Sequence, residues 1–296
     1  MMLNKSTKYE ALAPAKINLY LDVLSKMENG YHSIDSIMQS VSLFDKITLE
    51  ISQADYGNEI EIVSSSEKIP NDKSNIVYRV ADAILKESGK NGLRCLFTIE
   101  KNIPIAAGMA GGSSDGAAAM KLLNEALGNP FTHSQLCSMG AKIGADIPFC
   151  LTGGTAICQG IGEKITPIIP LSNVYVVCGI DSSNVSTPVA FKMLDDKFGT
   201  SCTPSMDINK MIDAIKSKDL NKIGALLYHK FESVIVPNNK AVAEIKAIML
   251  NCGALGALMS GSGPSVFGIF NDEISQRNAF NQLKTRSIRA FLCKTI

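Results

Sequence analysis

The sequence predicts an α+β protein of two domains, and three observations lead to this fold class. The chain has 296 residues, which is long for one domain and suits two, or one large one. Segments with strand and helix patterns follow one another without the strict alternation of a doubly wound parallel sheet. The softest boundary lies near residues 160–170. We therefore expect one domain over residues 1–165 and a second over residues 166–296.

In the first half of the chain, alternating polarity predicts strands and an apolar stripe predicts helices. Ile17 and Leu19 point one way and Lys16 and Asn18 the other, which predicts a half-buried strand over residues 15–23. The other strands expected in this half are 41–51, 59–65, 93–100, 149–151 and 155–159, and the helices are 74–89, 115–127 and 132–144.

Capping residues bound two of these helices. Ser74 is the expected N-cap of the first helix, which Gly89 ends, and Thr132 is the expected N-cap of the third.

In the second half of the chain, the same patterns predict the strands and helices. Its expected strands are 174–180, 254–259, 265–270 and 288–293, and its expected helices are 187–196, 207–228 with a break near Lys218, 239–249 and one before the last strand.

Charge and cysteine content exclude some classes of function. Lys and Arg total 29 and Asp and Glu total 28, so the net charge of +1 provides no basic field for nucleic acid. The eight cysteines form no C-x-x-C pair, which favours reduced thiols over a disulfide framework or a zinc site. Residues 1–10 are mostly polar and show no signal peptide, and no apolar run reaches membrane-spanning length. We expect a soluble cytoplasmic protein with no nucleic-acid or membrane partner.

The strongest chemical signal is the segment P-I-A-A-G-M-A-G-G-S-S at residues 104–114, just before a strong helix pattern. Glycines let a ligand approach the backbone, and free N–H groups at a helix start attract an anion. The pattern therefore predicts a phosphate site. It lacks the Lys-Ser/Thr pair of a Walker A loop and the G-x-G-x-x-G spacing of a dinucleotide fold. Glycines that serve only a tight turn are the alternative.

A second loop of small residues, S-G-S-G at 260–263, separates two short predicted strands. Taken alone it is typical of a hairpin turn. Together with the glycine-rich loop, it is a candidate for the far side of a phosphate site.

Phosphoryl transfer also needs a proton acceptor and a cation. Asp146, in G-A-D-I-P-F, is a candidate for the first role, and Lys16, in P-A-K-I-N-L, for the second. A turn Asp and a solvated Lys are the ordinary alternatives. Tyr31 and His32 follow an N-G turn and suit stacking on a base, but they also suit a packed ring beside an exposed histidine. Phe191 is equally compatible with a core position.

Six motifs, in order along the chain, resemble one family. P-A-K-I-N-L-Y-L, I-P-I-A-A-G-M-A-G-G-S-S-D and S-G-S-G-P-S-V-F resemble the three motifs of the galactokinase, homoserine kinase, mevalonate kinase and phosphomevalonate kinase (GHMP) superfamily. N-G-Y-H, G-A-D-I-P-F and V-S-T-P-V-A-F resemble its 4-diphosphocytidyl-2-C-methyl-D-erythritol kinase family. The resemblance spans about residues 13–270.

This resemblance implies an ATP-dependent kinase for the 2-hydroxyl of that diphosphocytidyl alcohol, in non-mevalonate isoprenoid (terpenoid) biosynthesis. It also implies a two-domain GHMP-kinase fold. The N-terminal domain would be ribosomal protein S5 domain 2-like and bind the ATP phosphates. The C-terminal domain would be ferredoxin-like, with the substrate cleft between the two.

The resemblance also implies residue roles. Asp146 would be the catalytic base, and Lys16 would keep it ionised and stabilise the transferred charge. Tyr31 and Phe191 would enclose the cytosine, and His32 would read its edge. The full set implied to bind substrate is Asn18, Tyr31, His32, Thr187 and Phe191, with Asn75 near adenine. The residues implied to wrap the ATP phosphates are Pro104, Ile105, Ala106, Ala107, Gly108, Met109, Ala110, Gly111, Gly112, Ser113 and Ser114.

Several properties stay open at this point. Mg²⁺ is expected with ATP, but its ligands are unknown because the loop offers no acidic residue beyond Asp115. Ala110 stands where relatives often have glycine, and its extra methyl group is expected to be tolerated. The chain is expected to be a monomer or a weak homodimer. The alternatives are another GHMP kinase, for homoserine or mevalonate, and a non-enzymatic RNA-binding module.

Overall fold

The computed structural model describes residues 6–180, 186–199 and 204–296, and the chain forms two compact units. The first unit comprises Met1–Ala15, Phe44–Ile105 and Ala110–Thr152, and the second comprises Lys16–Leu43, Ala106–Met109 and Gly153–Ile296. Both units draw on the first two strands, because these strands are long enough to contribute to each. The domain boundary expected between residues 165 and 166 stays a prediction.

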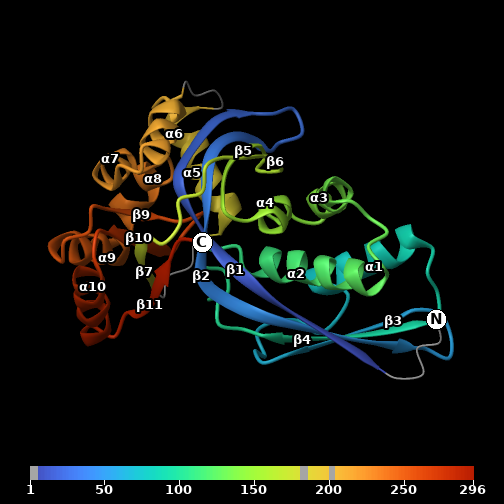
Figure 1. The fold of residues 1–296 in the computed structure, drawn as a ribbon. Coiled ribbons are helices and arrows are strands. Elements are labelled where there is room, and N and C mark those ends of the chain that lie inside the picture. The colour runs from blue at the N-terminus through green and yellow to red at the C-terminus, as the bar shows by residue number, and fades with distance from the viewer. Residues whose placement is uncertain (1–5, 181–185, 200–203) are drawn as a thin grey trace. The chain divides into compact units, whose positions relative to one another are not determined.

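Helices and strands are mixed along the chain (Figure 1). The strands are β1 (Thr7–Lys26), β2 (His32–Gln53), β3 (Glu59–Ser64), β4 (Leu93–Glu100), β5 (Thr155–Gly160), β6 (Lys164–Pro167), β7 (Tyr175–Ile180), β8 (Tyr228–His229), β9 (Gly256–Met259), β10 (Ser265–Phe270) and β11 (Arg289–Lys294). The α-helices are α1 (Ile76–Ser88), α2 (Gly111–Ala126), α3 (His133–Ala141), α4 (Ile147–Thr152), α5 (Thr187–Phe198), α6 (Ile208–Lys216), α7 (Leu220–Leu226), α8 (Glu232–Ile235), α9 (Lys240–Asn251) and α10 (Glu273–Thr285). A short 3₁₀ turn, Val236–Asn238, follows α8.

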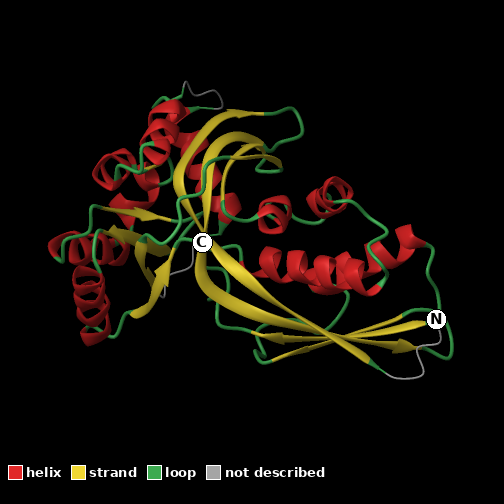
Figure 2. Ribbon diagram, in the orientation of Figure 1, coloured by secondary structure: helices red, strands yellow, loops and turns green. Residues whose placement is uncertain are grey.

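In the first unit, a sheet carries a layer of helices on one face (Figure 2). The second half of β2 pairs antiparallel with β4, and β4 pairs parallel with β3. Helices α1 and α2 pack side by side, and α4 packs against both α2 and α3. The apolar stripe of α1 is buried, and Gly89 ends the helix in the left-handed conformation, with φ of 64°. This layer sets the position from which α2 presents its first turn.

The second unit contains the other half of the long strands and a separate four-stranded sheet. The first half of β2 pairs with β5, β5 pairs with β6, and β1 pairs parallel with β8. The four-stranded sheet has the order β11-β7-β10-β9 and is antiparallel throughout. Helices α9 and α10 pack on this sheet and enclose an apolar core with α5 and α8. The α+β fold class is confirmed.

Three local predictions are wrong. The strand over 15–23 is not half-buried, because Lys16, Asn18 and their neighbours on the same face are buried as well. The apolar run 149–151 lies in helix α4, since a short apolar run suits either element and only tertiary packing decides between them. The N-cap of α1 is Asn75, one residue after the expected Ser74.

Two other local predictions are confirmed. Thr132 caps α3 and forms a capping box with Gln135. The long helical pattern 207–228 breaks into α6 and α7 at Lys218, whose φ is 54°. Seven cysteines, most of them buried, form no disulfide among the described residues, and Cys202 lies outside them. Among the described residues, no helix combines the length and apolar character needed to cross a membrane.

Candidate active site

Lys16 lies in a buried polar junction of the second unit. Its Nζ donates to Asn18 Oδ1 at 2.7 Å, and the same oxygen accepts the backbone N–H of Gly261 at 3.0 Å. Asn18 Nδ2 donates to Ser36 Oγ at 2.9 Å. Lys16 is 3% exposed and Asn18 is completely buried. A solvated lysine is therefore excluded, and Asn18 orients the ammonium group of Lys16.

The same junction joins part of the glycine-rich loop, residues 106–109, to the second loop. The backbone N–H of Lys16 donates to Met109 O at 3.1 Å, and Ser260 Oγ donates to Gly108 O at 3.1 Å. Gly108 has φ of 73°, and a Cβ at this position would lie 2.1 Å from Ser260 O. The two loops predicted to share a site therefore touch through backbone atoms, and only glycine permits this approach.

In the first unit, helix α2 begins inside the glycine-rich loop. Ala110 is its N-cap, with φ of 56°, and among the described residues no side chain caps it. The helix starts at Gly111, before the predicted Asp115, because Ser114 N already donates to Ala110 O at 2.9 Å. The first-turn N–H groups thus lack a capping side chain, which is the arrangement that binds an anion.

Asp146 stands at the start of helix α4 in the first unit and is half-buried. Its carbonyl accepts the N–H of Cys150 at 3.0 Å. A Cβ on Gly144 would lie 3.6 Å from Ser113 Oγ, so the turn that carries Asp146 passes beside a serine of the glycine-rich loop. The pairing of Asp146 with Lys16 stays a prediction.

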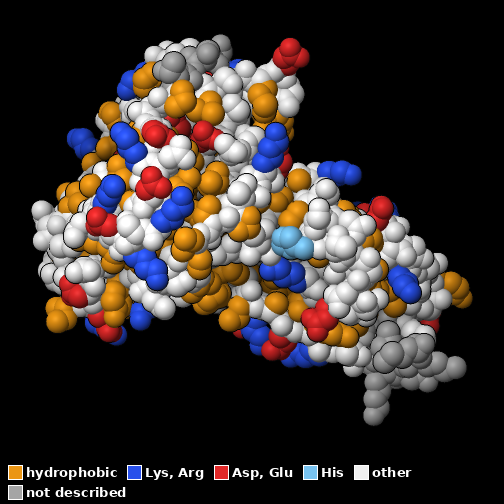
Figure 3. Space-filling model, turned by 45° about the horizontal axis from the view of Figure 1, so that its top comes forward, with side chains coloured by type: hydrophobic (Ala, Val, Ile, Leu, Met, Phe, Trp, Pro, Cys, Tyr) orange, Lys and Arg blue, Asp and Glu red, His pale blue; other side chains and the backbone are white. Residues whose placement is uncertain are grey.

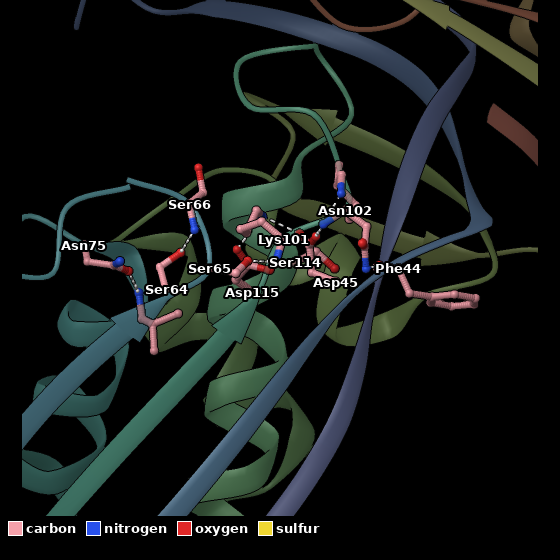
Figure 4. Close-up of polar contacts among 12 residues, drawn as sticks. Phe44, Asp45, Ser64, Ser65, Ser66, Asn75, Lys101, Asn102, Ser114 and Asp115 are labelled. Atoms are coloured by element: carbon pink, nitrogen blue, oxygen red, sulfur yellow. Dashed lines mark hydrogen bonds and ion pairs between the residues drawn. The ribbon is translucent and has the colours of Figure 1, made fainter. Parts of the chain in front are cut away.

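Two carboxylates share one lysine in the first unit (Figure 4). Lys101 Nζ donates to Asp115 Oδ2 at 2.6 Å and also to Asp45 Oδ2. Asp45 Oδ1 accepts the N–H groups of Asn102 at 2.6 Å and Ile103 at 2.8 Å. The three charged side chains are almost completely buried. The cluster ties strand β2 to the end of β4 and to the first turn of α2.

Burial raises the pKa of Asp115 to about 8, and the nearby charge of Asp45 adds to the effect against the opposing pull of Lys101. The single ammonium group of Lys101 compensates the charge of one carboxylate, that of Asp45. Asp115 is therefore favoured in its protonated form. Asp115 is therefore a poor Mg²⁺ ligand, because it is buried and engaged with Lys101. The described residues contain no group of three or more metal-ligating side chains.

His32 and Phe191, both expected at the substrate base, lie together in the second unit. Their rings stack with centroids 4.6 Å apart and planes 14° from parallel. His32 Nε2 lies 2.7 Å from Asp195 Oδ1, and Lys26 Nζ lies 2.7 Å from Asp195 Oδ2. Phe231 packs edge-on against Phe191 at 4.9 Å. Sequence reasoning missed Asp195 and Lys26, although Asp195 stands four residues after Phe191 and thus on the same face of a helix.

Of the remaining residues expected to bind substrate or ATP, Thr187 contacts the second loop at 260–263, while Tyr31 and Asn75 lie elsewhere. Thr187 Oγ1 lies 2.8 Å from Ser262 Oγ, which joins the start of α5 to the second loop. Tyr31 is 61% exposed. Asn75 acts as a helix cap, since its Oδ1 accepts Val77 N at 2.8 Å, and its proximity to adenine stays a prediction.

His229 is a buried histidine that sequence reasoning did not single out. It stands on β8, which pairs with β1. Burial lowers its pKa to about 3, and the positive charges of Lys16 and Lys246 contribute. The imidazole is therefore neutral at ordinary pH and does not add a second charge near Lys16.

Comparison with known proteins identifies the family. Residues 75–154 match the GHMP kinases N terminal domain, and residues 211–288 match the GHMP kinases C terminal domain. A 4-diphosphocytidyl-2-C-methyl-D-erythritol kinase of Alkaliphilus metalliredigens is 42% identical over 91% of this chain and 90% of its own length. The enzyme of the same name from Caldicellulosiruptor bescii is 43% identical over 92% of this chain and 93% of its own length.

Solved structures agree with these matches. A crystal structure of 4-(cytidine 5′-diphospho)-2C-methyl-D-erythritol kinase superposes with a TM-score of 0.80 at 27% identity, covering 97% of this chain and 99% of the other. Homoserine kinase from Cytophaga hutchinsonii has a TM-score of 0.76 at 17% identity over 98% of this chain and 94% of the other, which speaks for the fold alone. The chain therefore belongs to the GHMP kinases and, within them, to the 4-diphosphocytidyl-2-C-methyl-D-erythritol kinase family.

Proposed function

We propose that this protein transfers the γ-phosphoryl group of ATP to the 2-hydroxyl of 4-diphosphocytidyl-2-C-methyl-D-erythritol, a step of non-mevalonate isoprenoid biosynthesis. The observation that carries the proposal is the buried junction of Lys16, Asn18 and Gly261 beside residues 106–109. A cation oriented next to a glycine-rich loop is what a kinase needs to stabilise charge on a transferred phosphoryl group. The names of the relatives supply the substrate.

In the proposed reaction each residue has a task. The uncapped first turn of α2 holds phosphate oxygens through backbone N–H groups, and Ser113 flanks them. Ser114 is buried and its Oγ donates to Pro14 O at 2.7 Å, so its own contact with phosphate stays a prediction. Asp146 accepts the proton of the substrate hydroxyl. Lys16, fixed by Asn18, stabilises the developing negative charge. This makes Asn18 a residue that positions the lysine, while its direct contact with substrate stays a prediction.

We expect Mg²⁺ to accompany ATP and to take most of its ligands from phosphate oxygens and water, because Asp115 does not fit the role. The cysteines that the structure describes form no disulfide, which suits a reducing compartment, and we propose a cytoplasmic location on that ground. A monomer or weak homodimer stays a prediction.

The decisive experiment measures ADP release with the diphosphocytidyl substrate, with its uridine analogue and with homoserine and mevalonate. We expect turnover with the first and little with the small acids, because His32 is proposed to read the edge of the cytosine, a base that such acids lack. Turnover of homoserine or mevalonate in preference to the diphosphocytidyl compound would contradict the proposal.

The base assignment has its own test. Asp146→Asn keeps the shape of the side chain but removes the proton acceptor, so kcat is expected to fall by about 10²–10⁴ with the fold unchanged. Circular dichroism and urea unfolding check the fold, and the same assay measures kcat. Asp82→Asn, on the exposed face of α1, is the matched control and is expected to keep the parent kcat. Full activity of Asp146→Asn would remove Asp146 from the reaction.

A further inference from the structure

Helix α5 holds the imidazole of His32 from two directions. Phe191 and Asp195 are four residues apart and thus one turn apart on the same face of the helix. Phe191 stacks on the imidazole ring with centroids 4.6 Å apart, while Asp195 Oδ1 contacts the ring edge at Nε2, 2.7 Å away. The His32 side chain is 7% exposed and that of Asp195 is 17% exposed, so solvent competes little for this hydrogen bond.

The charge around Asp195 decides which ring nitrogen carries the proton. Burial tends to raise the pKa of this carboxyl, but the hydrogen bonds and charges of Lys26 and His32 outweigh it and hold the pKa below its usual value. An ionised carboxylate only accepts hydrogen bonds, so Nε2 of His32 must donate. In the neutral ring the other nitrogen, Nδ1, is then an acceptor.

We propose that Asp195 is a positioning residue that fixes the tautomer and orientation of His32 and so sets the preference for cytosine over uracil. The inference rests on the proposed function, in which His32 reads the edge of the base. Cytosine carries an amino donor where uracil carries a carbonyl acceptor. An imidazole whose Nδ1 is an acceptor can accept a hydrogen bond from the amino group of cytosine. The same Nδ1 repels the carbonyl oxygen of uracil, because both atoms are acceptors and neither can donate. If the ring were free to exchange tautomers, it would accommodate either base.

The test compares kcat/KM for the diphosphocytidyl substrate with kcat/KM for its diphosphouridyl analogue. The parent is expected to prefer the cytidine compound. Asp195→Ala should lower that preference by about tenfold, the effect of losing one charge-assisted hydrogen bond, and should leave the KM for ATP within about twofold. Asp195→Asn keeps an oxygen that can accept from Nε2 and should retain an intermediate preference, and it also serves if the alanine variant folds poorly.

The matched control is Asp196→Ala, which removes an exposed carboxylate from the next position of the same helix. It should keep the preference of the parent. A double-mutant cycle then separates positioning from a general effect on α5. If Asp195 acts through His32, adding Asp195→Ala to His32→Ala should cause no further loss of preference.

The outcomes are distinguishable. An unchanged preference in Asp195→Ala, an equal loss in Asp196→Ala, or a full additional loss on the His32→Ala background would each overturn the inference while the proposed function stands. A parent that phosphorylates both compounds equally would also overturn it. A parent that is inactive on the diphosphocytidyl substrate would overturn the proposed function, and the inference with it.

Discussion

Single atoms decide how closely the two small-residue loops of the second unit approach. The backbones of Gly108 and Gly261 touch, since a Cβ on Gly261 would lie 2.8 Å from Gly108 Cα. Both residues also have positive φ, so a side chain would be strained and would collide. Asn18 then links this contact to Lys16 through one side-chain oxygen. The lysine is thus placed by the same contact that joins the loops.

This arrangement predicts a large effect of Gly108→Ala. The new methyl group would meet the carbonyl of Ser260, so the loops must separate and Lys16 loses its fixed position. We expect kcat/KM to fall at least about tenfold, with a stability loss beyond the roughly 1–2 kcal/mol of left-handed strain alone. ADP release and urea unfolding measure the two effects.

Gly128→Ala is the control that separates left-handed backbone strain from the collision between the loops. Gly128 has φ of 84°, but a Cβ there meets nothing within 4 Å. This variant should lose stability through strain alone and keep its kcat/KM. Equal activity of the two variants would show that the close approach of the loops is dispensable.

At the scale of elements, the start of helix α2 contains a strained residue. Ala110 is the N-cap and lies in the left-handed region, with φ of 56°. Alanine pays a steric cost there that glycine avoids. The alanine at this position therefore has a backbone cost in addition to the volume of its methyl group.

Ala110→Gly is therefore expected to stabilise the protein by about 0.5–1 kcal/mol, after subtracting the larger entropy of glycine in the unfolded chain. The KM for ATP should stay within about twofold, because the backbone that faces the phosphates is retained. Urea unfolding provides the measurement. Ala126→Gly, at the end of the same helix, should do the opposite and cost up to about 1 kcal/mol. A loss of stability in both variants would contradict the strain at Ala110.

Elements with local signals could be predicted from the sequence, and those that depend on tertiary packing could not. The cap at Thr132, the break at Lys218 and the stripe of α1 follow from local chemistry. The burial of both faces of β1 does not, because it depends on segments far away in the sequence that cover its polar face. The contact between His32 and Asp195 joins residues 163 positions apart, and its only local sign is the four-residue spacing of Asp195 from Phe191.

At the scale of the whole molecule, charge is balanced rather than patterned. The net charge is +1, and the face drawn in Figure 3 shows acidic and basic side chains interspersed. A protein that binds the phosphate backbone of RNA needs a stripe of basic side chains, and this face does not present one. Selectivity for a charged nucleotide must then come from local groups such as the first turn of α2. Because the surface charges balance, we expect the change of folding stability with pH to come mainly from a few buried titratable groups.

Asp115 is the buried group expected to dominate between pH 6 and 8. Its pKa is about 8 in the folded protein, against about 3.9 in an unfolded chain. The folded state therefore holds a proton that the unfolded state has lost, so the stability that Asp115 contributes is complete below pH 4 and is lost as pH rises through 8. His229 acts in the opposite sense, but its pKa of about 3 confines its effect to pH values below about 6.5.

Asp115→Asn should remove this dependence. The amide mimics the protonated acid and leaves Lys101 paired with Asp45 alone. From pH 6 to pH 8 we expect the free energy of unfolding to fall by about 2 kcal/mol in the parent relative to the variant, because each unit of pKa difference is worth about 1.4 kcal/mol. Urea unfolding at four pH values across this range provides the measurement. Asp55→Asn, at an exposed position of the same unit, should follow the parent. If Asp115→Asn also followed the parent, the carboxyl would be ionised throughout, and Lys101 would compensate both acids at once.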